Sequence, residues 1–193
     1  MNAPYDDGPL LEALIKKYPF GARLPAHINL YSFPVHEAVK KNHPNQLRVL
    51  AKASVNLDEI DSDTYAPIHY AAMRSNAAMV SLLLKLGANP NRTAEFSLTA
   101  LHIACKKGDA DVVKALLESD ELKIDLPDYD SFTGLLFAVC HSKYDCARVL
   151  LDAGASSRRK CGEGWDSLEW ACQRSDQEMI SIIHEARNKE SIY

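Results

Sequence analysis

Three histidines, His36, His69 and His102, stand 33 residues apart, each inside a short stretch that reads apolar-His-x-Ala. The three stretches are FPVHEA, APIHYA and TALHIA. The same slot continues at TGLLFA, where Leu136 replaces the histidine, and at DSLEWA, where Glu169 does. Five copies in one register predict that the chain is an array of one small structural unit.

Each copy carries the signals of two short helices. Pro34 and Pro67 stand near the expected start of a first helix, where the missing N–H costs nothing. Thr99 and Thr133 stand just before the start in the next two copies, where a hydroxyl can act as an N-cap. Apolar residues then recur 10, 11, 14 and 15 positions after the histidine slot, which predicts one apolar stripe on a second helix. They are Met79, Val80, Leu83 and Leu84, then Val112, Val113, Leu116 and Leu117, then Cys146, Ala147, Leu150 and Leu151.

The period of 33 residues and the TPLHxA-like core resemble the ankyrin-repeat family over nearly the whole chain. The resemblance implies an all-α repeat fold, an ankyrin solenoid of helix-turn-helix units with hairpin fingers. We expect a single ankyrin-repeat domain over 1–193, with about five repeats and an N-terminal half-repeat cap. The expected segments are a cap at 8–25, repeats at 30–61, 62–94, 95–128 and 129–161, and a final repeat with the C-terminal cap at 162–193. In this family the repeated histidine bonds locally to hold the helix start, so the resemblance implies structural roles for His36, His69 and His102.

The last copy departs from the pattern at both of its helices. Asp166 followed by Glu169 forms a capping-box sequence, so Glu169 is predicted to tie the helix start as histidine does elsewhere. In the final helix, His184, Glu185 and Arg187 stand where a further repeat would need apolar residues. We expect these three to form the polar outer face that a terminal repeat requires.

Composition excludes several classes of protein. A net charge of −4 and a pI near 6.0 argue against nucleic-acid binding. The sequence has no run of 18 apolar residues and its start lacks the features of a secretory signal, so we expect no membrane association. An odd number of cysteines, 5, without a CxxC pair favours reduced thiols in a cytoplasmic, possibly nuclear, protein.

Metal and catalytic sites are disfavoured. Neighbouring repeats stack about 10 Å apart, whereas zinc–nitrogen bonds are near 2.0–2.1 Å, so the periodic histidines do not share an ion. Cys140, His141, Cys146 and Cys161 form the other candidate cluster, but no paired spacing supports it. No nucleophile elbow, phosphate loop or paired acidic motif is present. We therefore expect no metal, no cofactor, no small-molecule substrate and no enzymatic activity.

Two sets of residues occupy repeat positions that we do not expect to pack in the core. In ankyrin repeats the concave binding face is built from the fingers and from the late part of each first helix. Four positions before the histidine slot stand residues that we name the ridge: Tyr65, Leu98, Phe132 and Trp165. Four and five positions after it stand residues that we name the ladder, in which most side chains are basic: Lys41, Met73, Arg74, Lys106, Lys107, His141 and Arg174. Acidic finger tips beside a basic ladder suggest a partner segment with charges of both signs.

Aromatic residues next to cations are typical of binding hot spots. We therefore expect the following residues to dominate partner binding: Tyr65, Phe132, Trp165, Arg74, Lys107 and Arg174. The alternative is that the lysines are only solvated and the finger aromatics pack against neighbouring fingers. The family also contains asparagines that are hydroxylated, and the resemblance places Asn91 in that slot.

The leading functional hypothesis is a monomeric, non-catalytic adaptor or scaffold that binds another protein or peptide. The alternative is an inhibitory or targeting subunit of a kinase, phosphatase or ubiquitin ligase. A third hypothesis is that the chain is one segment of a larger scaffold. FPVHEA and DSDTYAPIHYAA have a weaker local similarity to the ankyrin segment of the Krev-interaction-trapped scaffold family.

Overall fold

The computed structural model describes residues 34–190, so the cap expected at 8–25 lies outside the described residues. The described part contains ten α-helices, one short 3-10 helix and no strand. In chain order the elements are α2 (Pro34–Lys40), α3 (Pro44–Lys52), α4 (Pro67–Met73), α5 (Ala77–Lys85), η1 (Glu95–Ser97), α6 (Ala100–Lys107), α7 (Ala110–Leu117), α8 (Gly134–Cys140), α9 (Tyr144–Asp152), α10 (Ser167–Gln173) and α11 (Gln177–Glu190). Among these helices none is both long and apolar enough to cross a bilayer.

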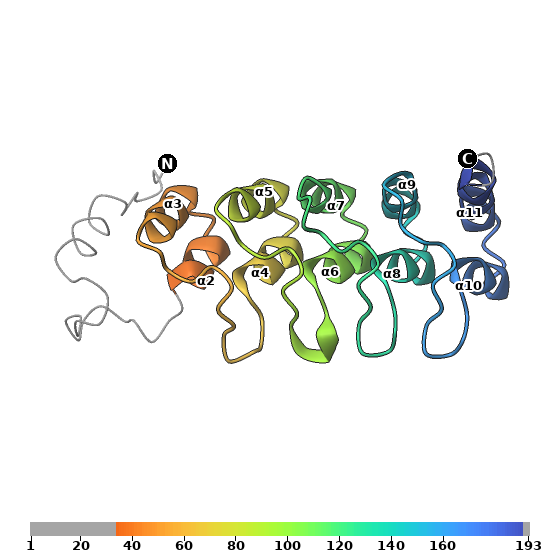
Figure 1. The fold of residues 1–193 in the computed structure, drawn as a ribbon, viewed down its shortest axis with the longest axis horizontal. Helices are drawn as coiled ribbons and strands as arrows, with labels where there is room; N and C mark the ends of the chain where they lie inside the picture. The colour runs from red at the N-terminus through yellow and green to blue at the C-terminus, as the bar shows by residue number, and fades with distance from the viewer. Residues whose placement is uncertain (1–33, 191–193) are drawn as a thin grey trace, which may run out of the picture.

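The helices form two parallel rows (Figure 1). The first helix of each pair, α2, α4, α6, α8 and α10, lies in the row nearer the loops, and the second helices form the other row. Contacts run between neighbours within each row, such as α4 with α6 and α5 with α7, and within each pair. The long loops between pairs project to one side as fingers (Figure 1). The predicted all-α solenoid is confirmed.

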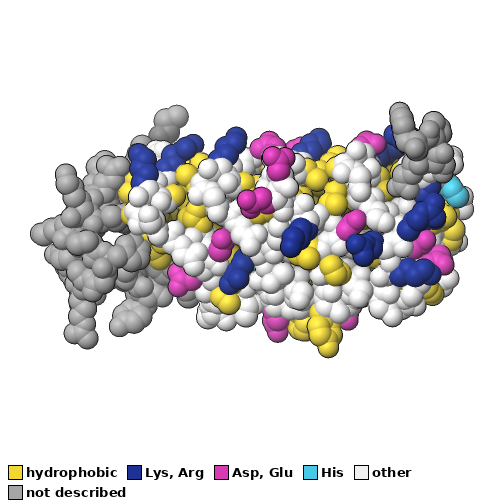
Figure 2. Space-filling view, viewed as in Figure 1, with side chains coloured by type: hydrophobic (Ala, Val, Ile, Leu, Met, Phe, Trp, Pro, Cys, Tyr) yellow, Lys and Arg dark blue, Asp and Glu magenta, His cyan; other side chains and the backbone are white. Residues whose placement is uncertain are grey.

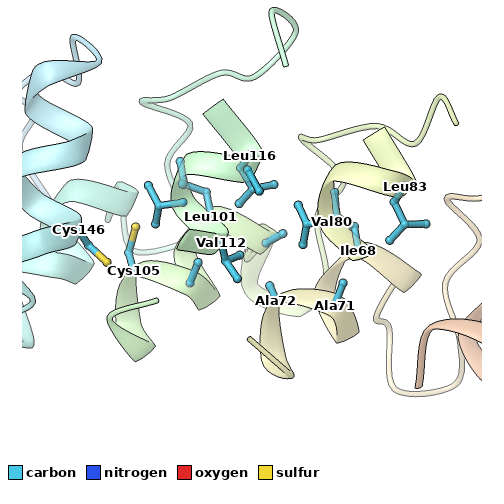
Figure 3. Packing of buried hydrophobic residues seen from close by; sticks show 14 of the residues in the cluster. Ile68, Ala71, Ala72, Val80, Leu83, Leu101, Cys105, Val112, Leu116 and Cys146 are labelled. Atoms are coloured by element: carbon cyan, nitrogen blue, oxygen red, sulfur yellow. The ribbon is translucent and has the colours of Figure 1, made fainter. Parts of the chain in front are cut away.

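The core is a continuous layer of apolar side chains between the two rows of helices (Figure 3). Ala71 and Ala72 of α4 are fully buried, and such small residues allow the first helices to approach closely. Leu83 and Leu116, from the stripes predicted on the second helices, are also fully buried. Each repeat therefore shields the apolar face of its neighbour, as expected of a solenoid.

The repeated histidines of α2, α4 and α6 bond to the next finger, and two of them also bond to the start of their own helix. The Nδ1 atoms of His69 and His102 accept the backbone N–H groups of Ala66 and Thr99, each at 3.0 Å. The Nε2 atoms donate to carbonyls of the next finger: His36 to Tyr65 at 2.8 Å, His69 to Arg92 at 2.9 Å and His102 to Phe132 at 3.1 Å. The bonds at the helix start are confirmed for His69 and His102. The bonds to the next finger are an additional role that the sequence pattern does not reveal.

The two copies without histidine use different helix starts. Asp166 accepts the backbone N–H groups of Leu168 and Glu169, and the Glu169 carboxylate accepts the Asp166 N–H at 2.7 Å. This reciprocal arrangement confirms the predicted capping box. At α8 the Thr133 hydroxyl accepts the Leu136 N–H at 3.4 Å, so this start is tied by one long bond.

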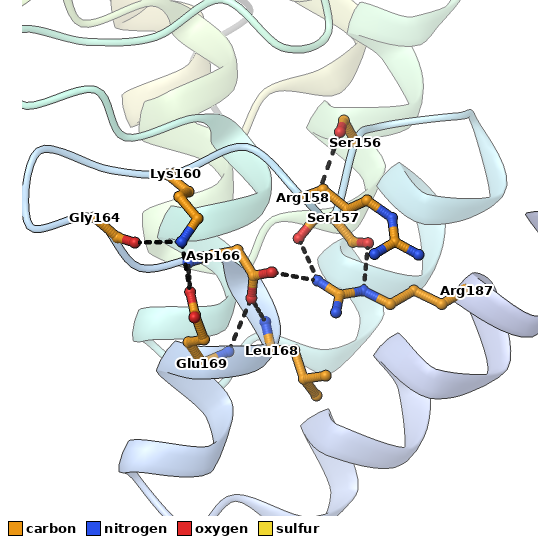
Figure 4. Close-up of polar contacts among 9 residues, drawn as sticks. All are labelled: Ser156, Ser157, Arg158, Lys160, Gly164, Asp166, Leu168, Glu169 and Arg187. Carbon is orange, nitrogen blue, oxygen red and sulfur yellow. Dashed lines mark hydrogen bonds and ion pairs between the residues drawn. The ribbon is translucent and has the colours of Figure 1, made fainter.

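Arg187 of α11 reaches back to the fourth finger (Figure 4). Its guanidinium donates to the Ser157 hydroxyl at 2.9 Å and to the Ser157 carbonyl at 2.8 Å, and it lies 2.8 Å from the Asp166 carboxylate. The prediction that Arg187 belongs to the polar outer face is therefore wrong. The guanidinium fork instead satisfies three acceptors in the finger between α9 and α10. His184 and Glu185 are exposed, as predicted.

Candidate functional site

Aromatic residues of the fingers lie on aromatic residues of the first helices. All four ridge residues are half-buried, and three of them contact an aromatic ring one position after the histidine slot. The ring pairs and their centroid distances are Tyr65–Tyr70 at 5.8 Å, Phe132–Phe137 at 5.7 Å and Trp165–Trp170 at 5.1 Å. These distances and the tilted or edge-on geometries are those of favourable ring contacts.

A further contact joins two repeats, because the Phe132 and Trp170 rings lie 5.8 Å apart. In the repeat between the tyrosines and these rings, the equivalent slots hold the aliphatic residues Leu98 and Ile103. We name the six rings the aromatic strip: Tyr65, Tyr70, Phe132, Phe137, Trp165 and Trp170. The three from the helices also pack against the core, whereas the three from the fingers lie over them. Counting one position past the histidine slot would have found the second row in the sequence.

Polar contacts hold the tyrosine end of the strip. The Tyr70 hydroxyl donates to the Asp61 carboxylate at 2.7 Å. The Lys40 ammonium lies 3.4 Å from the same carboxylate and 3.9 Å from the Tyr70 ring centroid. Burial and the contact with Asp61 raise the pKa of Tyr70, so its hydroxyl stays protonated and remains a donor. Burial alone would raise the pKa of Asp61, but hydrogen bonds led by the Tyr70 hydroxyl outweigh it and lower this pKa.

The ladder residues differ in their exposure and in the intramolecular contacts that they make. Arg74, Lys106 and Arg174 are exposed and form no ion pair within residues 34–190. Lys41 pairs with Glu37 at 3.0 Å in an exposed pair that contributes little to stability.

The remaining ladder residues are Met73 and His141. Met73 is half-buried at the end of α4. The His141 ring stacks on Phe137 with an interplanar angle of 16°, and its Nδ1 donates to the Phe137 carbonyl at 2.9 Å. His141 therefore extends the aromatic strip rather than adding an unengaged charge.

Lys107 is engaged by the preceding repeat. Its ammonium donates to the Met73 carbonyl at 2.6 Å and to the Ser75 hydroxyl at 2.7 Å, and it lies 3.2 Å from the Asp109 carboxylate. The Met73 carbonyl is one of the orphan acceptors at the end of α4. All three donors of Lys107 are used, so we remove it from the residues expected to dominate partner binding.

Lys107→Met is expected to lower the free energy of unfolding by about 1 kcal/mol, because it keeps the apolar stem and deletes a charged bond to an orphan carbonyl. Urea unfolding followed by circular dichroism measures the change. Lys106→Met is the matched control, since the neighbouring lysine makes no such bond, and it should shift stability by less than about 0.5 kcal/mol. Equal effects of the two substitutions would contradict this role of Lys107.

Polar side chains in the loops after the second helices link each repeat to the next. Asp58, Asn91 and Asp125 occupy one slot, and each accepts a backbone N–H from the next unit. The donors are Asn89 at 2.9 Å, Lys123 at 2.8 Å and Ser156 at 3.0 Å, respectively. The Asn91 amide also donates to the Glu121 carbonyl at 2.7 Å. Both the oxygen and the NH2 group of the Asn91 side chain therefore bond to the next repeat. Hydroxylation of Asn91 stays a prediction.

The Cys140 and Cys146 thiols are protonated at neutral pH. Burial raises the pKa of Cys140 and of Cys146 to about 11 in each case. Metal binding and nucleophilic attack need the thiolate, which burial disfavours here. Within the described residues there is no group of three His, Cys, Asp or Glu side chains placed to hold a metal ion.

A family model described as ankyrin repeats in three copies matches residues 2–94 and again residues 92–161. The chain belongs to the ankyrin-repeat family. A search of curated proteins returned no match. Ankyrin repeats are generally protein–protein interaction modules and are typically non-catalytic. The aromatic strip and the exposed cations Arg74, Lys106 and Arg174 of this ankyrin-repeat protein are thus candidate contacts for another protein.

Proposed function

We propose that this ankyrin-repeat protein is a non-catalytic adaptor or scaffold that binds a peptide or domain of another protein. The observation that carries the proposal is the half-buried aromatic strip, together with three exposed cations at the ends of α4, α6 and α10 that form no ion pair with a described residue. A partner would bury the remaining ring surface, and apolar burial contributes roughly 25 cal/mol per Å². Arg74, Lys106 and Arg174 would meet carboxylates of the partner and orient it.

We also propose that the protein acts as a monomer in the cytoplasm or the nucleus. The described cysteines are all free thiols, in keeping with a reducing compartment. The alternative of an inhibitory or targeting subunit uses the same face. Co-purification of a kinase, phosphatase or ubiquitin ligase would favour that alternative, and the length of the native transcript tests whether a larger scaffold contains this chain.

The test is affinity purification followed by mass spectrometry, comparing the wild-type chain with a Phe132→Ala/Trp165→Ala variant. Each substitution removes an aromatic anchor, so we expect the affinity of the captured partner to fall by at least about tenfold. Circular dichroism melting establishes that the variant is folded. Equal capture by a folded variant would refute the proposed binding face.

The cations are tested in the same complex by their effect on association. The Arg74→Gln/Lys106→Gln/Arg174→Gln variant is expected to slow association and to weaken its dependence on salt. Lys85→Gln is the matched control, because Lys85 is an exposed cation at the end of α5, in the other row of helices. An association rate of the wild type that does not depend on salt would count against a role for these cations.

A further inference from the structure

Two aromatic side chains are held outside the fold at the tips of neighbouring fingers. Phe96 is 62% exposed and Tyr129 is 78% exposed, the highest values among the large apolar residues of the described chain. The Tyr129 N–H donates to the Phe96 carbonyl at 2.9 Å, so the two tips are joined backbone to backbone. Figure 2 shows apolar side chains gathered at the lower edge of the molecule, with acidic side chains on both sides.

The backbone at Phe96 departs from the repeat pattern. Left-handed residues otherwise recur in three slots: the turn within each helix pair at Asn42, Ser75, Gly108, Ser142 and Ser175, the end of the second helix at Ser54, Gly87 and Gly154, and the finger tip at Thr64, Ser97, Ser131 and Gly164. Phe96 falls outside these slots, with φ of 55°. A left-handed conformation is unfavourable for a bulky residue. The second finger, between α5 and α6, therefore holds an exposed aromatic ring in an unfavourable backbone conformation.

The exposed charged residues of the finger tips are acidic. Asp63, Glu95, Asp130 and Glu163 are exposed residues of the four finger tips, and none forms an ion pair with a described residue. Two cations lie three residues before these acids in sequence. Lys160 is engaged by the Gly164 carbonyl at 2.9 Å and by Glu169 at 3.5 Å, and Arg92 is half-buried rather than exposed. The edge therefore presents two apolar rings among carboxylates.

We propose that the finger tips form a second docking surface, separate from the aromatic strip, that binds an extended arginine-rich segment of a partner protein. A guanidinium group can stack flat on a Phe or Tyr ring and pair in two-pronged fashion with a carboxylate. Phe96 with Glu95, and Tyr129 with Asp130, place both features next to each other on each finger. An acidic segment would be repelled, and a purely apolar one would desolvate the carboxylates without pairing them.

The experiment measures fluorescence anisotropy of labelled 12-residue peptides with the full 193-residue chain. The probes alternate glycine or serine with arginine, with lysine, or with glutamate. We expect the arginine peptide to bind, the lysine peptide to bind several-fold more weakly, and the glutamate peptide not to bind. Phe96→Asn/Tyr129→Ser should weaken the arginine peptide by about tenfold, because it removes both rings while asparagine tolerates the left-handed backbone.

Control variants separate the surface from charge in general. Glu95→Gln/Asp130→Asn should weaken the arginine peptide several-fold, whereas Asp120→Asn/Asp145→Asn, which neutralises two exposed acids away from the tips, should leave it within about twofold. Phe132→Ala/Trp165→Ala should also leave it unchanged, which keeps this test independent of the proposed binding face.

Three results would overturn the proposal. One is unchanged binding by a folded Phe96→Asn/Tyr129→Ser variant, and another is equal affinity for the lysine peptide. The third is a concentration-dependent dimer in sedimentation that this variant abolishes, which would make a second copy of the chain the occupant.

Discussion

Acidification from pH 7 to pH 5.5 is expected to lower the free energy of unfolding steeply, because two buried histidines must stay neutral in the fold. His69 and His102 are 0% and 1% exposed. The Nδ1 atom of each accepts a hydrogen bond from a backbone N–H. Protonation would place an N–H on Nδ1, so the ring and the backbone would then face each other with two donors and no acceptor. Burial lowers the pKa of both groups and outweighs their bonds to carbonyls, which act in the opposite direction.

The direction of the pH effect follows from the lowered pKa. In the unfolded chain a histidine titrates near pH 6.5, above the pKa that it has in the fold. The stabilisation is fully present above the unfolded pKa and is lost as the pH falls toward the folded pKa. The loss approaches about 1.4 kcal/mol per pH unit for each histidine, or nearly 3 kcal/mol per unit for the two. Urea unfolding at pH 7.0, 6.0 and 5.5 measures this slope.

The chain supplies its own control for the histidine effect, because Leu136 fills the same slot in the fourth unit and is fully buried. His69→Leu/His102→Leu should be less stable at pH 7, since buried backbone groups lose their partners. Its stability should depend much less on pH between 6.5 and 5.5. Burial also lowers the pKa of His36, so a residual slope is expected. An unchanged slope in the double variant would show that other groups cause the acid sensitivity.

Arg187→Ala is expected to lower the free energy of unfolding by about 3 kcal/mol, because it removes the bonds to the buried Ser157 and the cation that pairs with the partly buried Asp166 carboxylate. The Arg187 and Asp166 side chains are 13% and 15% exposed, so water screens their ion pair only weakly. Asp166 also caps α10. Burial would raise the pKa of Asp166, but hydrogen bonds from the Glu169 backbone and from Arg187 outweigh it and lower this pKa. The carboxylate is therefore charged at neutral pH.

Hydrogen exchange measured by mass spectrometry should show where the stability is lost. Neighbouring repeats stabilise one another, so faster exchange in Arg187→Ala is expected first in α10 and α11. Lys189→Ala is the control from the same helix, because its ion pair with Asp152 is 71% and 70% exposed at its two ends. It should change stability by less than about 0.5 kcal/mol. Similar effects of the two variants would show that Arg187 acts only as a surface charge.

Short-range features of the fold could be predicted from the sequence because their causes lie within a few residues. Pro34 and Pro67 begin α2 and α4, and the Thr99 and Thr133 hydroxyls cap α6 and α8, as predicted. The apolar stripes follow from the helical period alone.

Contacts between repeats could not be predicted in the same way. Lys107 and Arg74 occupy the same slot of neighbouring repeats, yet Lys107 is bonded to the preceding helix and Arg74 forms no ion pair with a described residue. The direction in which a long side chain points depends on which hydrogen-bond acceptors and charged groups of the neighbouring repeat lie within its reach. Arg187 shows the same limit, because its acceptors lie 21 and 30 residues away in sequence.

The sequence by itself determined the repeating helix pair, the helix starts, the buried stripes and the candidate slots of the ridge. Periodicity encodes these features, since they depend on residues within one unit and on which face of a helix is apolar. Only the tertiary structure decided that the ridge rests on a second aromatic row, that Lys107 and Arg187 join neighbouring units, and that Phe96 and Tyr129 stand exposed. These depend on how two units meet at separations of about 20 to 35 residues, where stacking geometry selects among side chains that a repeat pattern treats as equivalent.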